Sequence, residues 1–128
     1  MRCAFCWTPP VLYAALIFWA SSRSEFRIAD RRLMVFDKAA HFFEFAILAL
    51  LIMRALLHSS LKRTSAWKNV VVVFLLVSLY ALTDEWHQSF VPNRHPDVMD
   101  WAVDTLGAAV FLLPFLFSSV SDRLSKEG

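Results

Sequence analysis

The sequence has little glycine and little charge for a chain of 128 residues. Two residues are glycine, 19% are charged and 58% are hydrophobic, whereas a soluble domain has about 25% charged and about 45–50% apolar residues. This balance excludes a disordered tail and a collagen-like chain. It also disfavours an ordinary soluble domain, because a chain this small buries too little surface to hide so many Phe, Leu and Val side chains. We therefore expect much of the apolar surface to face the lipid bilayer.

The sequence also has few cysteines and lacks several common catalytic motifs. Cys3 and Cys6 form a single C-x-x-C pair, so cysteines alone cannot close a zinc site and a small disulfide scaffold is excluded. No thioredoxin-like context surrounds them, and we interpret both as small apolar residues at a helix end. The sequence contains no H-E-x-x-H, no Gly-rich phosphate loop and no G-x-S-x-G. The net charge of +2 is too small to suggest nucleic-acid binding.

Four apolar stretches approach the ~20 residues that a transmembrane helix needs. The expected spans are residues 5–21, 39–57, 69–90 and 101–120. The first span is the weakest because it is short and carries two prolines near its start, where prolines fit a first helical turn. A cleaved signal peptide is the alternative, but no clear small-x-small cleavage site follows the apolar run. The sequence thus predicts an all-α integral membrane protein, a single domain of residues 1–128 with four transmembrane helices.

The positive charges give a weak signal for orientation. Four spans place both termini and the second loop on one side of the membrane. Of the 13 Lys and Arg residues, seven fall on that side and six on the other. Because Lys and Arg are enriched on the cytoplasmic side, this small excess favours cytoplasmic termini.

Ionisable residues gather at one end of three of the predicted spans. The second span opens with D-K-x-x-H-x-x-E, in which Asp37, His41 and Glu44 fall within about 60° of one another around a helix. The third ends with D-E-W-H-Q, in which Asp84 and Gln88 share a face while Glu85 and His87 point elsewhere.

The fourth span opens with Asp100 and Asp104 on one stripe, followed by Gly107, which permits close helix contact. Chain direction alone brings the start of the second span, the end of the third and the start of the fourth to the same membrane face. Charged residues inside spans are usually functional. The sequence therefore predicts one polar pocket at this face, formed by Asp37, His41, Glu44, Asp84, Gln88, Asp100 and Asp104.

The link between the third and fourth spans, residues 91–100, is stiffened by Pro92 and Pro96. It carries Arg94, whose guanidinium suits the pocket carboxylates or a phosphate on a ligand. Lys38 either binds the same charge or reaches the membrane interface.

The predicted pocket is compatible with several kinds of chemistry. His41 with Asp37, Asp84 and Asp104 could bind Mg²⁺, Mn²⁺ or Zn²⁺ and activate water or hold a phosphate. Without a metal, a carboxylate and His41 could act as acid and base in a hydrolase or transferase. Buried carboxylates also occur in proton relays, although four helices are few for a carrier unless the chain forms homo-oligomers. A purely structural cluster is the remaining alternative.

The motifs resemble those of the VanZ-like family of small bacterial membrane proteins. D-K-x-x-H-F at residues 37–42, D-E-x-x-Q-x-F-x-P-x-R at residues 84–94 and D-x-x-x-D-x-x-G at residues 100–107 occur in the family's order. Serines follow the first span, as in the family, so the resemblance covers residues 21–107. Two positions differ, since Asp104 stands where the family usually has Asn and Phe111 where a second glycine often follows.

The resemblance implies a four-helix protein of the bacterial inner membrane with its motifs at the extracytoplasmic face. It also implies a link to susceptibility to teicoplanin-type glycopeptides, and a cell-envelope lipid or lipid-linked glycan as the ligand. We expect a catalytic centre of Asp37, His41, Asp84 and Asp104, with ligand-binding residues Lys38, Glu44, Gln88, Arg94 and Asp100. The alternative is a non-enzymatic membrane module whose polar residues hold helices or a partner protein together.

Overall fold

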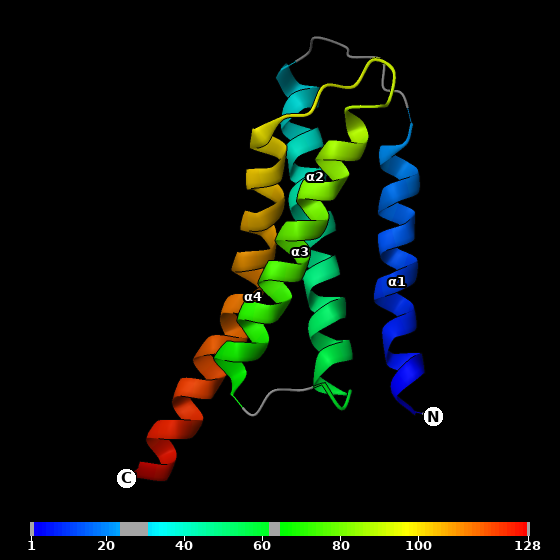
Figure 1. The fold of residues 1–128 in the computed structure, drawn as a ribbon. Coiled ribbons are helices and arrows are strands. Elements are labelled where there is room, and N and C mark those ends of the chain that lie inside the picture. The colour runs from blue at the N-terminus through cyan, green and yellow to red at the C-terminus, as the bar shows by residue number, and fades with distance from the viewer. Residues whose placement is uncertain (1, 24–30, 62–64, 128) are drawn as a thin grey trace.

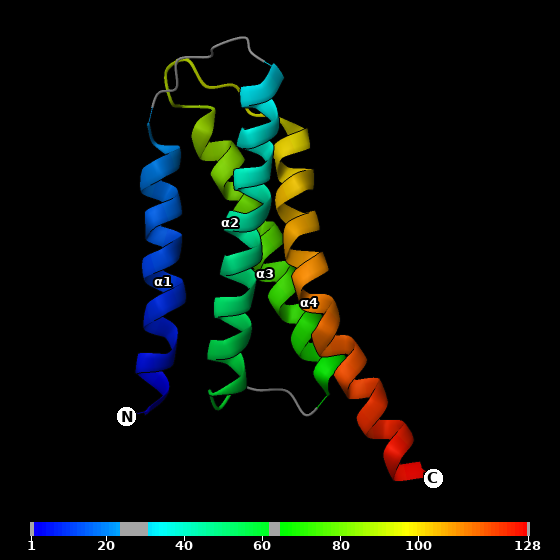
Figure 2. The same cartoon turned by 180° about the vertical axis from the view of Figure 1, so that it is seen from behind.

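The structure is a computed structural model that describes residues 2–23, 31–61 and 65–127, with side chains for residues 5–23, 35–61 and 65–117. The described chain forms four α-helices and no strand: α1 (Arg2–Ser21), α2 (Arg31–Leu57), α3 (Ala66–Gln88) and α4 (Val98–Glu127). The helices run alternately up and down (Figure 1). The end of α1, the start of α2, the end of α3 and the start of α4 therefore lie together, and the two chain ends lie at the opposite end of the bundle (Figure 2). The prediction of an all-α protein is confirmed.

Three of the helices have the length and apolar composition needed to cross a membrane. These segments are Val35–Leu57, Ala66–Gln88 and Val98–Phe117, while Phe5–Ser21 is apolar but shorter. Leucines such as Leu75 and Leu79 on α3 are more than half exposed. Such a large apolar exterior is typical of a surface covered by lipid. The first helix is the weakest span, as the sequence predicts.

All four helices begin earlier than the predicted spans, which start at residues 5, 39, 69 and 101. α1 begins at Arg2, so Pro9 and Pro10 lie inside it rather than in its first turn, and that prediction was wrong.

α2 begins at Arg31 and α4 at Val98, so Asp37 and Lys38 lie inside α2 rather than at its opening. α4 also continues to Glu127, beyond the predicted end of its apolar run. The reason is physical: hydropathy marks where a segment leaves the hydrocarbon, whereas a helix continues for as long as its backbone hydrogen bonds do.

α2 lies at the centre of the packing and contacts each of the other three helices. Much of the core consists of small or branched side chains, including Ala49, Val73, Val77 and Ala108. Small side chains let helix backbones approach closely, which is the main source of helix association in a membrane.

The closest approach joins α2 and α4 at Gly107. A Cβ atom on Gly107 would overlap the backbone carbonyl of Phe42, so the predicted close contact at this glycine is confirmed. One turn later, Phe111 packs edge-on against Phe42 and Phe43, with ring centroids 6.3 Å apart in each pair. This contact aligns the start of α4 with the polar stripe of α2.

Two hydrogen bonds tie the middle of α3 to its neighbours α1 and α4. The Tyr80 hydroxyl donates to the carbonyl of Ala14 on α1 at 2.6 Å. The Trp101 indole N–H on α4 donates to the carbonyl of Ser78 at 3.2 Å. Polar ties of this kind fix the rotation of each helix in an apolar surrounding.

Candidate functional site

The start of α2, the end of α3 and the start of α4 lie together at the end of the bundle where α3 connects to α4 (Figure 1), and polar residues of these segments contact one another there. Several of them are buried: His41, Asp84, Glu85, Gln88 and Asp104. Buried ionisable residues are costly and are retained where they have partners or a function.

His41 and Asp104 form a buried pair between α2 and α4. The Nδ1 atom of His41 lies 3.2 Å from Oδ1 of Asp104, and Asp104 is completely buried. The second oxygen, Oδ2, has no hydrogen-bond partner among the described residues. The pair therefore orients the imidazole and leaves one carboxylate oxygen unsatisfied.

Asp84 and Gln88 form a second buried pair, one turn apart on α3. The side-chain amide of Gln88 donates to Oδ2 of Asp84 at 2.8 Å, which confirms the prediction that the two share a face. The other oxygen, Oδ1 of Asp84, is buried and has no hydrogen-bond partner within the described part of the chain.

Lys38 connects α2 to the start of α4 and to the link before it. Its ammonium group lies 2.5 Å from Oδ1 of Asp100 and 3.3 Å from Oδ2 of Asp97. We predicted Lys38 and Asp100 as ligand-binding residues, and the structure pairs them with each other. Asp97 was not among the predicted site residues.

Glu85 corrects one sequence prediction. We expected it to point away from the site, yet it is only 5% exposed and its Oε2 accepts the backbone N–H of Asp97 at 2.8 Å. The link covers this face of α3 because the chain reverses direction at Asn93, which has a positive φ of 64°, a conformation that Asn tolerates better than most residues. A helical projection considers one helix at a time, so it cannot reveal that a returning link buries a second face.

Glu44 and Arg94 complete the group. Glu44 is half-buried and interacts electrostatically with His41, Asp84, Asp104 and Arg94. The guanidinium of Arg94, from the link, therefore acts on a carboxylate of α2. We call these residues together the polar cluster: Asp37, Lys38, His41, Glu44, Asp84, Glu85, Gln88, Arg94, Asp97, Asp100 and Asp104.

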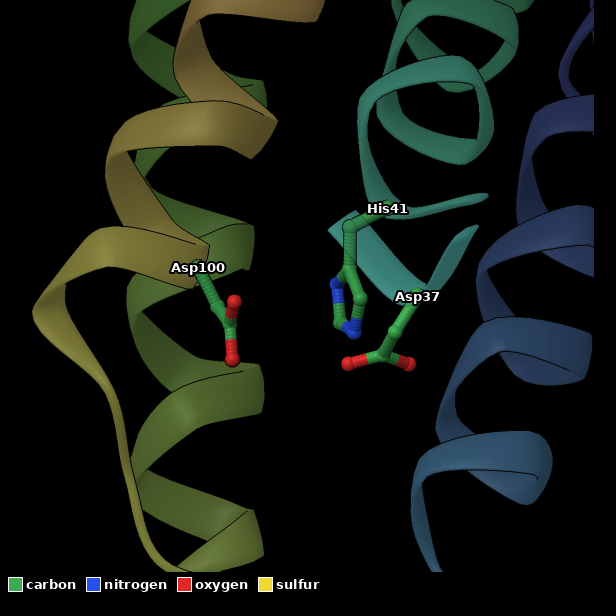
Figure 3. A group of neighbouring side chains, drawn as sticks. All are labelled: Asp37, His41 and Asp100. Carbon is green, nitrogen blue, oxygen red and sulfur yellow. The ribbon is translucent and has the colours of Figure 1, made fainter. Parts of the chain in front are cut away.

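One part of the polar cluster has the composition of a metal site. Asp37, His41 and Asp100 each offer a donor atom, and these three atoms lie within 4.8 Å of one another. Figure 3 shows the carboxylates of Asp37 and Asp100 on either side of the imidazole ring. Of the metal ligands predicted from sequence, this group contains Asp37 and His41. The other two predicted metal ligands, Asp84 and Asp104, do not belong to the three-residue group that the described side chains form.

A cavity of about 310 Å³ lies beside the polar cluster, between α1 and α3. Its lining residues are Phe18, Tyr80, Thr83, Asp84, Trp86 and His87. Asp84 thus borders the cavity and also belongs to the polar cluster, so the two are continuous.

The serines after the first helix play a structural part here. The hydroxyl of Ser22 donates to the carbonyl of Phe18 at 2.6 Å and lies 2.9 Å from Nε2 of His87. Because the hydroxyl of Ser22 donates its proton to the Phe18 carbonyl, its oxygen accepts a hydrogen bond from Nε2 of His87. Ser22 is therefore not activated as a nucleophile. Ser21 is buried and also donates to Phe18, and Ser24 lies outside the described residues.

These features define an all-α membrane protein with a buried polar cluster at one end of its bundle. The VanZ/LLP1 family model matches residues 7–119, and the chain therefore belongs to the VanZ/LLP1 family. The resemblance drawn from the three motifs is confirmed. No curated protein and no solved structure gives a significant match to the chain.

Proposed function

We propose that this VanZ-like membrane protein binds the head group of a cell-envelope lipid or lipid-linked glycan at the polar cluster. The lipid chain would lie in the cavity between α1 and α3. The observation that carries the proposal is that Asp84 belongs to both: a cavity of about 310 Å³ with aromatic walls ends at buried ionisable groups. A ligand with an apolar chain and a polar head group fits a cavity that has aromatic walls and ends at ionisable residues.

Arg94 supports an anionic head group. A guanidinium is the group of choice for bidentate recognition of phosphate or carboxylate, and Arg94, in the link, interacts electrostatically with Glu44 of α2. The family resemblance favours the extracytoplasmic face of the bacterial inner membrane for this site, and teicoplanin susceptibility as the corresponding phenotype.

The His41–Asp104 pair supports an acid–base role on the bound head group. A histidine whose Nδ1 is held by a carboxylate has its other ring nitrogen directed at the reacting group, as in many hydrolases and transferases. The competing proposal is a non-enzymatic module, and the Lys38 ion pairs with Asp97 and Asp100 favour it because they join elements of the fold.

The cavity can be tested with a lipid probe. Purified protein is placed in phosphatidylcholine nanodiscs that contain a phosphatidylglycerol with a diazirine in its acyl chain. We expect cross-links to Phe18, Tyr80 or Trp86 after illumination. Thr83→Trp fills the cavity with a larger side chain. If this keeps two methylene groups of the acyl chain out of the cavity, lipid binding loses about 1.6 kcal/mol, so cross-linking at these residues should fall roughly tenfold.

Leu82→Trp is the matched control, because Leu82 is 54% exposed and does not line the cavity. This variant should be labelled at the cavity residues like the unmodified protein. Equal labelling of both tryptophan variants would exclude the cavity as the lipid site.

A further inference from the structure

We propose that Asp37, His41 and Asp100 form a divalent transition-metal site, with Asp104 orienting the histidine ligand. The donor atoms of the first three residues lie within 4.8 Å of one another (Figure 3). Three protein ligands that leave further coordination positions open are typical of sites that exchange water or substrate. Asp37 is exposed, so an ion has a path to this group.

The hydrogen bond between His41 and Asp104 prepares the imidazole for an ion. Since Nδ1 is held by Asp104 at 3.2 Å, the tautomer with its proton on Nδ1 has an unshared electron pair on Nε2. Metal-binding histidines almost always have such a carboxylate or carbonyl on their other nitrogen, which fixes the ring and raises its basicity. Asp104 is completely buried, so it holds the ring in one orientation.

The charges around the three-residue group are predominantly negative. Asp104 is turned toward His41, yet its Oδ2 is buried without a hydrogen-bond partner among the described residues, as is Oδ1 of Asp84. The polar cluster contains seven carboxyl groups but, apart from the imidazole, two cationic side chains, Lys38 and Arg94. A divalent ion bound by Asp37, His41 and Asp100 would add positive charge to this cluster, although Asp84 and Asp104 do not belong to the three-residue group that the described side chains form.

The donor set indicates the class of metal. One imidazole with two carboxylates suits Mn²⁺ or Zn²⁺ better than Mg²⁺, which prefers oxygen ligands and retains much of its water. Asp100 already binds Lys38 through Oδ1, and its second oxygen remains for the ion. A bound ion would also give an anionic head group a positive partner in a cluster that is otherwise negative.

The site can be tested without any lipid, by titrating the purified full chain with MnCl₂ in detergent and measuring free Mn²⁺ by electron paramagnetic resonance. A tag without histidine avoids competition. We expect saturable binding of one ion per chain. Asp37→Asn and Asp100→Asn should each weaken binding at least tenfold, while Asp97→Asn should leave it unchanged. Asp97 is a fair control because it also pairs with Lys38 but is not in the three-residue group.

Pulsed resonance of the Mn²⁺-loaded unmodified protein keeps the proposal falsifiable if a variant fails to fold. We expect a nitrogen coupling from one imidazole, and its loss in a folded His41→Gln variant. Absence of saturable binding, absence of the nitrogen coupling, or equal weakening by Asp97→Asn would overturn the metal site. Because the proposal uses the same cluster as the proposed lipid site, the lipid cross-linking is repeated with and without Mn²⁺. Ion binding without cross-linking would retain the metal site and exclude the lipid proposal, and cross-linking without ion binding would do the reverse.

Discussion

At the scale of single residues, the contact between His41 and Asp104 best separates a functional role from a structural one. Residues retained for function are often replaceable without loss of stability, whereas residues retained for packing are not. Asp104 has one oxygen on His41 and one without a partner. Its charge and its hydrogen bond can therefore be removed separately.

Asp104→Asn retains a carbonyl oxygen for the His41 N–H and removes the buried charge. We expect the free energy of unfolding in detergent to stay the same or to rise. Asp104→Ala removes the acceptor as well and should lower it by about 1–3 kcal/mol, the usual cost of a buried donor without a partner. Chemical denaturation of the two variants beside the unmodified protein measures both effects. If Asn destabilises the protein as much as Ala does, the charge itself holds the helices together and the structural alternative is favoured.

At the scale of elements, the packing of α2 against α4 places the polar stripes opposite each other. The overlap that a Cβ atom at Gly107 would make with the Phe42 carbonyl shows that these two backbones touch. The aromatic contacts of Phe111 continue this interface. A change that separates the two helices should therefore disturb both stability and the His41–Asp104 distance.

Gly107→Ala should destabilise the protein by about 1–3 kcal/mol, because an extra methyl group in a tight interface forces the backbones apart. Val110→Ala on the same helix is the control: Val110 is 42% exposed, and exposed substitutions usually change stability by less than about 0.5 kcal/mol. The free energy of unfolding in detergent measures both variants. Equal stability of the two would mean that α4 can shift away from α2 at no cost.

At the scale of the whole molecule, the orientation in the membrane decides which compartment the polar cluster faces. The excess of one Lys or Arg on the side of the termini favours cytoplasmic termini, and the family resemblance favours an extracytoplasmic cluster. The two chain ends lie at the end of the bundle opposite the cluster (Figure 2), so both statements are compatible with one orientation.

Single cysteines introduced after replacing Cys3 and Cys6 by serine can test this orientation in intact cells. We expect a membrane-impermeant maleimide to label His95→Cys, in the link at the cluster end. It should not label Ser60→Cys, between α2 and α3, until the cells are opened. Both positions are exposed, so access to the compartment is what differs. If only Ser60→Cys were labelled in intact cells, the orientation in the membrane would be the opposite of the one expected.

The fold class, and the end of the bundle at which the polar residues meet, could both be predicted from the sequence. Apolar runs predict helices of membrane-spanning length, and alternating chain direction brings the motifs at residues 37–44, 84–88 and 100–104 to one face. Both inferences need only composition and chain connectivity.

The pairing of the polar groups, by contrast, could not be predicted without the packing of the helices. Asp104 rather than Asp100 holds His41, Asp100 instead binds Lys38, and Glu85 joins the cluster through the returning link. These choices depend on how far each helix is rotated and shifted along its neighbour. Side-chain packing sets both quantities, and a pattern read along one helix contains no information about the helix beside it.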